Sequence, residues 1–401
     1  MSAQPLTFLC IASYEKGAEF LRECGRQGVR VLFVTVEGLR DADWPREAIA
    51  ETFYLPDEHS REDVIKGVSW IARKERISRI VPLDEFDLET ASALREHLRV
   101  PGMGETTVRH FRDKLAMRFK AREAGLAVPD FAPVHNDADL ADFLDRQPAL
   151  WILKPRGEAS AVGLQKLDRA EAVWGALDAL GDRRSHFLVE QFVAGDVFHV
   201  DALVAEREVR FEEAHGYAAP PFDVMHGGGV FATRTLRRDS DEARELKALN
   251  RQLVASLGLV RGAVHTEFIR GREDGRLYFL ETAARVGGAH IAETVEAATG
   301  VSLWREWARV EIADARGEAY EAPERRDDYA GVLISLARQE RPDLSAYSDP
   351  EVVWRMEKRH HAGLVLRAPT ADRVEALLAD YMRRFAEDFS ASLPAPDRAT
   401  A

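Results

Sequence analysis

A chain of 401 residues is long enough for two or three domains with sizeable cores, and its 46% hydrophobic and 31% charged residues argue against disorder. The net charge of −13 argues against a nucleic-acid partner, because contact with a phosphate backbone requires a basic surface. No apolar run is long enough to cross a membrane and no signal-peptide pattern opens the chain, so we expect a cytoplasmic protein. Cys10 and Cys24 lie in apolar patterns and are predicted to be buried thiols.

The first hundred residues alternate between predicted strands and helices. Apolar runs predict strands at 6–13, 30–36 and 77–83, and helical periodicity is found at 15–27 and 61–75. This alternation is typical of a parallel, three-layer α/β unit. No GxGxxG follows the first strand, which excludes a dinucleotide fingerprint. The residues after the last strand, Asp84, Glu85 and Phe86, lie where open α/β sheets place ligands, but an acidic helix cap fits them equally well.

The middle of the chain mixes strands with helices. A linker at 99–104 leads into a helical region that contains Lys114 and ends at Gly125. Further strands are predicted at 150–154, at 164–167, twice within 186–204 and at 229–236, and helices at 240–257, capped by Ser240 or Asp241, and over most of 289–316. Beyond residue 317, two strands and a helix predict a small α/β lobe, followed by a tail that should be disordered.

A predicted β-hairpin carries two carboxylates. Its strands, 263–269 and 276–281, flank a turn at 271–275, and each contains one acid, Glu267 or Glu281. A hairpin can bring the two acids side by side, where they repel each other unless a cation or proton lies between them. Oxygen ligands favour Mg²⁺ or Mn²⁺ over zinc. The alternative is a solvated hairpin with two ordinary acidic residues.

Lysine and small residues follow another strand. Lys154 ends an apolar run, and in the loop after it, 156–163, five of eight residues are Gly, Ala or Ser. Such a loop can bring backbone N–H groups onto phosphate oxygens, although a surface hairpin with an exposed lysine has the same pattern. Lys114 alone would be a solvated charge. Residues 190–193 offer an apolar slot with backbone groups for an adenine, or simply join two strands.

Two histidines lie among these candidate site residues in the sequence. His226 precedes glycines at 227–229, which predict either a mobile flap over a substrate or a long hairpin turn. His265 lies two residues from Glu267 and therefore on the same strand face. Zinc would need more nitrogen or sulfur ligands than the neighbourhood offers, so we expect a structural or supporting role for His265.

In their order along the chain these pieces resemble the ATP-grasp superfamily. The most specific pieces are WILKP around Lys154, HTEF around Glu267, and FLETAARVGGAHI, which contains Glu281 and Arg285. The resemblance covers about residues 1–315, and the C-terminal part resembles the extra lobe of biotin-carboxylase-like members. It implies an α/β fold, α+β in the nucleotide-binding part, divided as follows: a half-Rossmann parallel sheet at 1–104, an ATP-grasp domain at 105–316 with a lid at about 125–195, and a C-terminal lobe at 317–401.

The resemblance also implies residue roles. Glu267 and Glu281 would hold Mg²⁺, with Mn²⁺ as an alternative, and Arg285 and Lys154 would act in catalysis. The residues expected to bind ATP are Lys114, Lys154, Ser160, Glu190, Gln191, Phe192, Val193 and Asp196. The residues expected to contact substrate are Glu85, His199, His226, Arg285, Gly287 and Gly288.

The sequence departs from the family pattern at two positions. Ala283 stands where the family has an asparagine that ligates metal, so the protein would supply fewer ligands to one ion. Val197 stands where an acid often binds the ribose, and we expect Asp196 to substitute for it.

Endings like AARVGG are similar to those of amino-acid ligases. The implied activity is an ATP- and Mg²⁺-dependent ligase that activates a carboxylate as an acyl phosphate, joins it to an amine, and releases ADP and phosphate. The alternatives are a carboxylase-like enzyme that uses carboxyphosphate and a nucleotide-binding regulator without catalysis. The implied partners are a small carboxylate and a small amine, with no nucleic acid and no membrane, and the family implies a homodimer.

Overall fold

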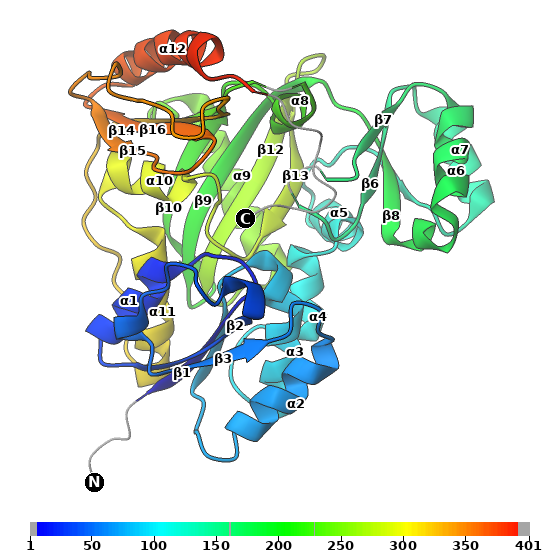
Figure 1. Cartoon of the computed structure of the whole chain (residues 1–401). Coiled ribbons are helices and arrows are strands. Elements are labelled where there is room, and N and C mark those ends of the chain that lie inside the picture. Colours follow the sequence, from blue (N-terminus) through cyan, green and yellow to red (C-terminus); the bar gives the residue numbers. More distant parts are fainter. Residues whose placement is uncertain (1–5, 160–161, 228, 392–401) are drawn as a thin grey trace.

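The computed structural model describes residues 6–159, 162–227 and 229–391, which form three β-sheets. The N-terminal sheet is entirely parallel, in the order β3-β2-β1-β4. Its apolar strands are covered on both faces, by α1 and α11 on one side and by α2 and α3 on the other (Figure 1). These elements are β1 (Thr7–Ala12), α1 (Ala18–Arg26), β2 (Arg30–Val36), β3 (Glu51–Leu55), α2 (Arg61–Ile71), β4 (Arg79–Pro82), α3 (Leu88–Leu98) and α11 (Leu303–Arg316).

The predicted parallel unit is therefore confirmed, with two elements that the sequence did not reveal, β3 and α3. The remaining short helices in and around it are α4 (Glu105–Val108) and the 3-10 turns η1 (Glu37–Leu39), η2 (Arg46–Ala48), η3 (Glu85–Asp87) and η4 (Arg109–Phe111). A further 3-10 turn, η5 (Gly181–His186), belongs to the third sheet, where it joins α7 to β8.

The large central sheet has eight strands in the order β13-β12-β9-β10-β11-β14-β16-β15, all antiparallel to their neighbours. Its strands are β9 (Gly195–Ala205), β10 (Glu208–Tyr217), β11 (Phe231–Thr235), β12 (Gly262–Gly271), β13 (Leu277–Ala283), β14 (Tyr329–Leu336), β15 (Val352–Arg355) and β16 (His361–Ala368). On β9 and β12, alternate residues enter the core formed with α5 (Lys114–Glu123) and α9 (Asp241–Leu257). The other residues of these two strands face away from that core.

Four helices, α8 to α11, connect or cover the strands of this sheet. α9 begins after Ser240, whose Oγ accepts a hydrogen bond from Ala243 N–H at 3.1 Å, which decides between the two predicted caps. The short helix α8 (Pro221–Gly227) ends at the first of the glycines, 227–229, that were predicted as a flap or a hairpin turn. After β13, α10 (Ile291–Thr299) and α11 follow, and α11 packs against both α1 and the end of β9 and β12.

The C-terminal strands β14, β16 and β15 extend the central sheet, and α12 (Ala371–Asp388) packs against it at the top of Figure 1. The boundaries at 104/105 and 316/317 stay predictions. Residues 392–401 of the predicted disordered tail lie outside the described residues.

The third sheet projects from the side of the molecule and has the antiparallel order β5-β8-β6-β7 (Figure 1). Its elements lie within the range predicted for the lid: β5 (Phe131–Pro133), α6 (Asp137–Arg146), β6 (Trp151–Pro155), β7 (Gln165–Leu167), α7 (Ala170–Leu180) and β8 (Phe187–Gln191). Both helices pack on one face of the sheet, because their apolar residues share its core.

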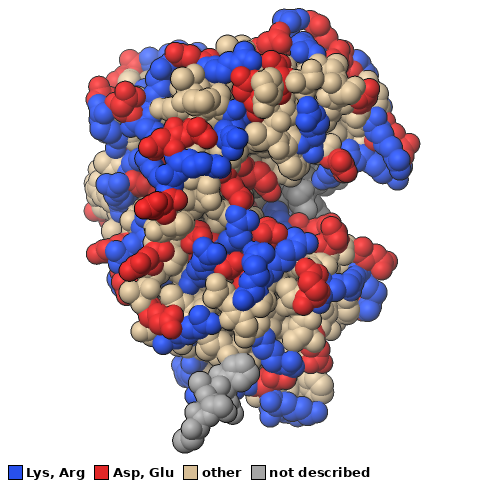
Figure 2. Space-filling model, turned by 90° about the vertical axis from the view of Figure 1, so that its left-hand side faces the viewer, with Lys and Arg blue, Asp and Glu red and all other residues tan. Residues whose placement is uncertain are grey.

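On the face shown in Figure 2, basic and acidic residues are interspersed. Among the described residues, no helix combines the length and the apolar character that a bilayer crossing requires. The predictions of a cytoplasmic protein and of no nucleic-acid partner stay predictions.

Candidate active site

Glu267 and Glu281 lie directly opposite each other. The register of β12 and β13 pairs the two residues, as the predicted hairpin allows. Because strand residues alternate, Thr266 and Phe268 are buried toward α9 while Glu267 faces away from that core. The side chains of Glu267 and Glu281 keep 18% and 35% exposure. Their carboxylates are thus within reach of a ligand from outside the sheet.

Each carboxylate has a partner from another element. Lys114 is the first residue of α5, and its Nζ lies 3.0 Å from Glu281 Oε2. Tyr217, at the end of β10, donates its hydroxyl to Glu267 Oε1 at 2.7 Å. Although burial opposes the charged form, His265 and Tyr217 lower the pKa of Glu267. Two carboxylates paired across neighbouring strands form a donor set that suits a hard divalent cation such as Mg²⁺.

A buried charge group lies at the base of the third sheet. Lys154 at the end of β6 and Arg118 of α5 both bind the carboxylate of Glu190 on β8, and the Arg118 Nε–Glu190 Oε2 distance is 3.0 Å. Burial lowers the pKa of Lys154 to about 8, although Glu190 acts in the opposite direction. Burial opposes the ionisation of Glu190, but Arg118 and Lys154 keep its pKa below the usual range. The group carries one positive charge more than negative, which suits a phosphate.

The small-residue loop after β6 is held by the segment that leads into α5. Lys114 N–H donates to Arg156 O at 2.9 Å, and Lys114 Nζ donates to Glu158 O. Arg112 donates to Gly157 O. The predicted phosphate loop therefore lies beside Lys114 as well as Lys154. Ser160, predicted to contact phosphates, lies outside the described residues.

In the predicted adenine hinge, two of the backbone donors are already used. Gln191 N–H donates to Asp130 O at 2.7 Å, and Phe192 N–H donates to Leu150 O at 2.9 Å. Among the hydrogen bonds of residues 6–159, 162–227 and 229–391, none uses Val193 N–H, and the adenine contact of Val193 stays a prediction.

The predicted ribose position is exposed. The carboxylate of Asp196 keeps 78% exposure, and its Oδ1 lies 4.0 Å from Arg272 Nη2. Val197, which stands at the usual acidic position, is buried.

Glu85 and Arg285, predicted as separate substrate contacts, form one ion pair. Arg285 Nε and Nη2 lie 2.8 and 2.6 Å from Glu85 Oε1, and Arg112 Nη1 lies 3.2 Å from Glu85 Oε2. Against the effect of burial, the two arginines lower the pKa of Glu85 to about 2. A substrate carboxylate at Arg285 would therefore meet a guanidinium that already has a counter-ion. Asp84, by contrast, caps η3 through Phe86 N–H at 3.0 Å.

The other predicted contacts are placed differently. His199 is fully buried, with Nδ1 2.6 Å from Asp201 Oδ2 and Nε2 2.8 Å from Thr233 Oγ1. Gly287 lies against Asp201, and Gly288 has open space around it. The side chain of His226 lies outside the described part of the structure, so its predicted substrate contact stays a prediction.

No protein-family model matches the chain. It is 25% identical over 262 residues to the L-arginine-specific L-amino acid ligase of Bacillus subtilis, a match covering 64% of this chain and 63% of that protein. It is 30% identical over 222 residues to the D-alanine–D-alanine ligase of Ralstonia pickettii, covering 53% of this chain and 67% of that protein. The chain belongs to the ATP-grasp superfamily.

The fold agrees with this membership. An L-amino acid ligase of Bacillus licheniformis, known from a crystal structure, superimposes with a TM-score of 0.76 and 20% sequence identity, over 98% of this chain and all of that one. The predicted ATP-grasp fold is therefore confirmed. The chain matches less than two thirds of the length of the Bacillus subtilis ligase, at 63%.

Four residues that contact the candidate site residues were not predicted from the sequence: Arg112, Arg118, Asp201 and Tyr217. Asp201 could have been found, because it lies two residues from His199 and thus on the same face of a strand. The two arginines belong to a segment rich in basic residues, and nothing in that pattern distinguishes a buried arginine from an exposed one.

Proposed function

We propose that this protein is an ATP- and Mg²⁺-dependent ligase that activates a carboxylate as an acyl phosphate and joins it to an amine. The observation that carries the proposal is the direct pairing of Glu267 with Glu281, with Lys114 Nζ 3.0 Å from Glu281. An ordinary surface hairpin does not require a half-buried lysine from a distant helix. The names of the two relatives, both of them ligases of amino acids, support the same reaction class.

The residues would divide the work of phosphoryl transfer, which depends mainly on positioning and charge neutralisation. Glu267 and Glu281 would hold Mg²⁺, or Mn²⁺, and the ion when bound would neutralise phosphate charge. Lys154 and Lys114 would bind phosphate oxygens, and Val193 N–H would orient the base. Because Ala283 offers no ligand atom, water would complete the coordination of the ion.

The substrate end of the site would be formed by Arg285 and the loop after it. Arg285 would stabilise the transferred phosphoryl group, with Glu85 fixing its guanidinium at 2.6 Å. The third sheet, which projects from the side of the molecule beside β13, would act as the lid that excludes water from a hydrolysable acyl phosphate (Figure 1). We propose amino acids as both the carboxylate and the amine, on the printed names of the relatives. A homodimer stays a prediction.

The test is a screen of carboxylate–amine pairs for release of ADP and phosphate. Glu281→Gln should abolish Mg²⁺-dependent turnover, whereas Glu273→Gln, in the exposed turn of the same hairpin, should leave it unchanged. Unchanged turnover in Glu281→Gln would overturn the assignment of the metal site. Turnover that requires bicarbonate would instead support the carboxylase-like alternative, and tight ATP binding without any ADP would support a regulator.

A further inference from the structure

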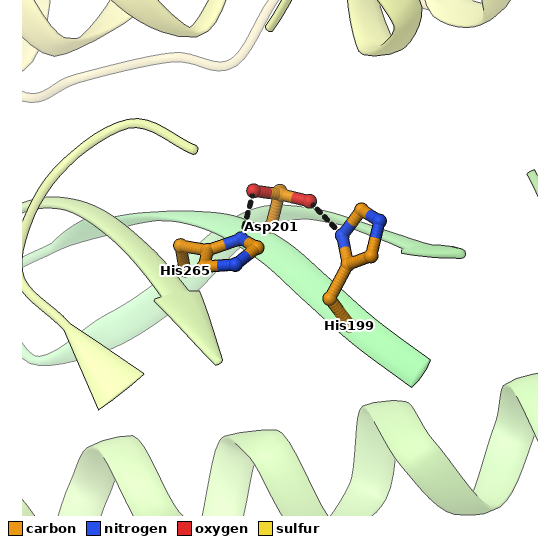
Figure 3. A group of neighbouring side chains, drawn as sticks. All are labelled: His199, Asp201 and His265. Atoms are coloured by element: carbon orange, nitrogen blue, oxygen red, sulfur yellow. Dashed lines mark hydrogen bonds and ion pairs between the residues drawn. The ribbon is translucent and has the colours of Figure 1, made fainter. Parts of the chain in front are cut away.

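A buried group of polar residues lies directly beside Glu267 on the same face of the central sheet. Asp201 on β9 lies between two imidazoles, each facing one of its oxygens (Figure 3). The His199 Nδ1–Asp201 Oδ2 distance is 2.6 Å, and the His265 Nδ1–Asp201 Oδ1 distance is 2.9 Å. The register of β9 and β12 produces this arrangement, because it pairs His265 with Asp201 and Glu267 with His199.

These three residues could be taken for a metal site, but the distances identify hydrogen bonds. Ligand atoms around a tetrahedral ion at about 2.0–2.1 Å lie roughly 3.3 Å apart, well beyond 2.6 and 2.9 Å. The second nitrogen of His199 is also used, since Nε2 lies 2.8 Å from Thr233 Oγ1. Asp201 and His199 are therefore hydrogen-bonded without an ion, whereas the buried His215, 3.7 Å from Asp201 Oδ2, has no hydrogen bond at either ring nitrogen.

One end of the group is directed at Glu267. Because His265 Nδ1 is engaged by Asp201, the opposite nitrogen of the ring, Nε2, points toward Glu267 and lies 3.6 Å from Oε1. The same Oε1 accepts the hydroxyl of Tyr217. Both groups face the same oxygen of Glu267, so together they favour one orientation of its carboxylate.

Asp201 also contacts the loop that follows Arg285. A Cβ added to Gly287 would lie 2.7 Å from Asp201 Oδ1 and 3.1 Å from His265 Nδ1, so the backbone of this loop rests directly on the pair. Asp201 thus contacts both His265, which faces Glu267, and Gly287 in the predicted substrate loop.

We propose that Asp201 is a positioning residue that, through His265, fixes the Glu267 carboxylate for the divalent cation. The proposal rests on the proposed role of Glu267 as a metal ligand. Residues that orient metal ligands typically contribute a factor of about 10–100 to metal affinity. Asparagine at position 201 has the same shape but is uncharged and has only one acceptor oxygen, so it can accept an N–H hydrogen bond from one imidazole and not from both.

The test measures metal binding rather than turnover. Binding of Mn²⁺ to the ADP complex is followed by electron paramagnetic resonance in the wild type, in Asp201→Asn and in Thr233→Val. We expect about 10–100-fold weaker Mn²⁺ binding in Asp201→Asn. Thr233→Val removes the partner of His199 at the far end of the same buried group and should bind Mn²⁺ like the wild type. If Asp201→Asn does not fold, His265→Gln breaks the same connection and is judged by the same titration.

The other possible results of this titration would contradict the inference, the hydrogen-bonded assignment or the proposed function. Unchanged Mn²⁺ affinity in Asp201→Asn overturns the inference alone. Equal weakening in Asp201→Asn and Thr233→Val also overturns it, because the group would then have only a general structural role. Stoichiometric transition metal in the unsupplemented wild type, lost in Asp201→Asn, overturns the hydrogen-bonded assignment. Absence of ADP-dependent Mn²⁺ binding in the wild type overturns the proposed function, and this inference with it.

Discussion

Glu190 is a buried carboxylate on which two buried cations converge, Lys154 from β6 and Arg118 from α5. Arg118 has the largest fully buried side chain among the described residues. It also donates to Leu280 O, in β13 next to Glu281. The group therefore ties the third sheet to the hairpin that carries the two predicted metal ligands.

Glu190→Gln should destabilise the protein strongly. It leaves Lys154 and Arg118 buried without a compensating charge, and such losses cost about 3–5 kcal/mol. Urea denaturation should show a fall of that size in the free energy of unfolding. Glu171→Gln, on the exposed side of α7, serves as the control and should change it by less than about 0.5 kcal/mol. A loss below about 1 kcal/mol for Glu190→Gln would mean that the group is hydrated.

Among single residues, the two carboxylates of the hairpin were easier to predict from the sequence than the basic residues around them. Glu267 and Glu281 were predictable, because strand periodicity and a turn rich in Gly and Asp place them opposite each other. Lys114 gave no signal of its own and gained meaning only through the resemblance. Arg118 was missed because an arginine in a helix is nearly always exposed.

Among the elements, β10 was the least visible in the sequence. It contains Glu212 and Glu213, both buried, which contradict the apolar pattern expected of a central strand. The charges are tolerated because Arg251 Nη2 lies 2.6 Å from Glu212 and Arg238 Nε lies 3.0 Å from Glu213. Such partners come from distant segments, so they cannot be inferred from the strand itself. Because β10 was not predicted, its last residue, Tyr217, was not recognised as a partner of Glu267.

The loop between β13 and α10 offers a test at the same scale. Gly287→Ala should destabilise the fold by about 1–3 kcal/mol, because its Cβ would lie 2.7 Å from Asp201 Oδ1. Gly288→Ala is the matched control: nothing lies within 4 Å of its added Cβ, and neither glycine has a positive φ. Thermal unfolding of both variants measures this, and the melting temperature should fall in Gly287→Ala more than in Gly288→Ala. Equal melting temperatures would show that the loop shifts freely and does not rest on Asp201.

Across the whole molecule, the contact between Glu85 and Arg285 joins parts of the chain that lie 200 residues apart. Glu85 follows β4 of the parallel sheet, and Arg285 follows β13 of the central sheet. The sequence marked both residues for the site, since each follows a strand in a pattern typical of ligand contacts. It could not reveal their pairing, because the relative placement of two sheets depends on packing such as that of α11 against α1 and β12.

This ion pair predicts a defined dependence of stability on pH. The pKa of Glu85 is lowered from its ordinary 4.5 to about 2, so its stabilising contribution is complete above pH 4.5 and is lost as the pH falls toward 2. A shift of this size corresponds to about 3 kcal/mol. Glu85→Gln should therefore lower the melting temperature at pH 7, and its difference from the wild type should shrink steadily between pH 4.5 and pH 2. Calorimetry on both proteins measures the difference, with Glu89→Gln, at an exposed position of α3, as a control that follows the wild type. A difference that stays constant from pH 7 down to pH 3 would mean that Glu85 stabilises the fold by its shape rather than by its charge.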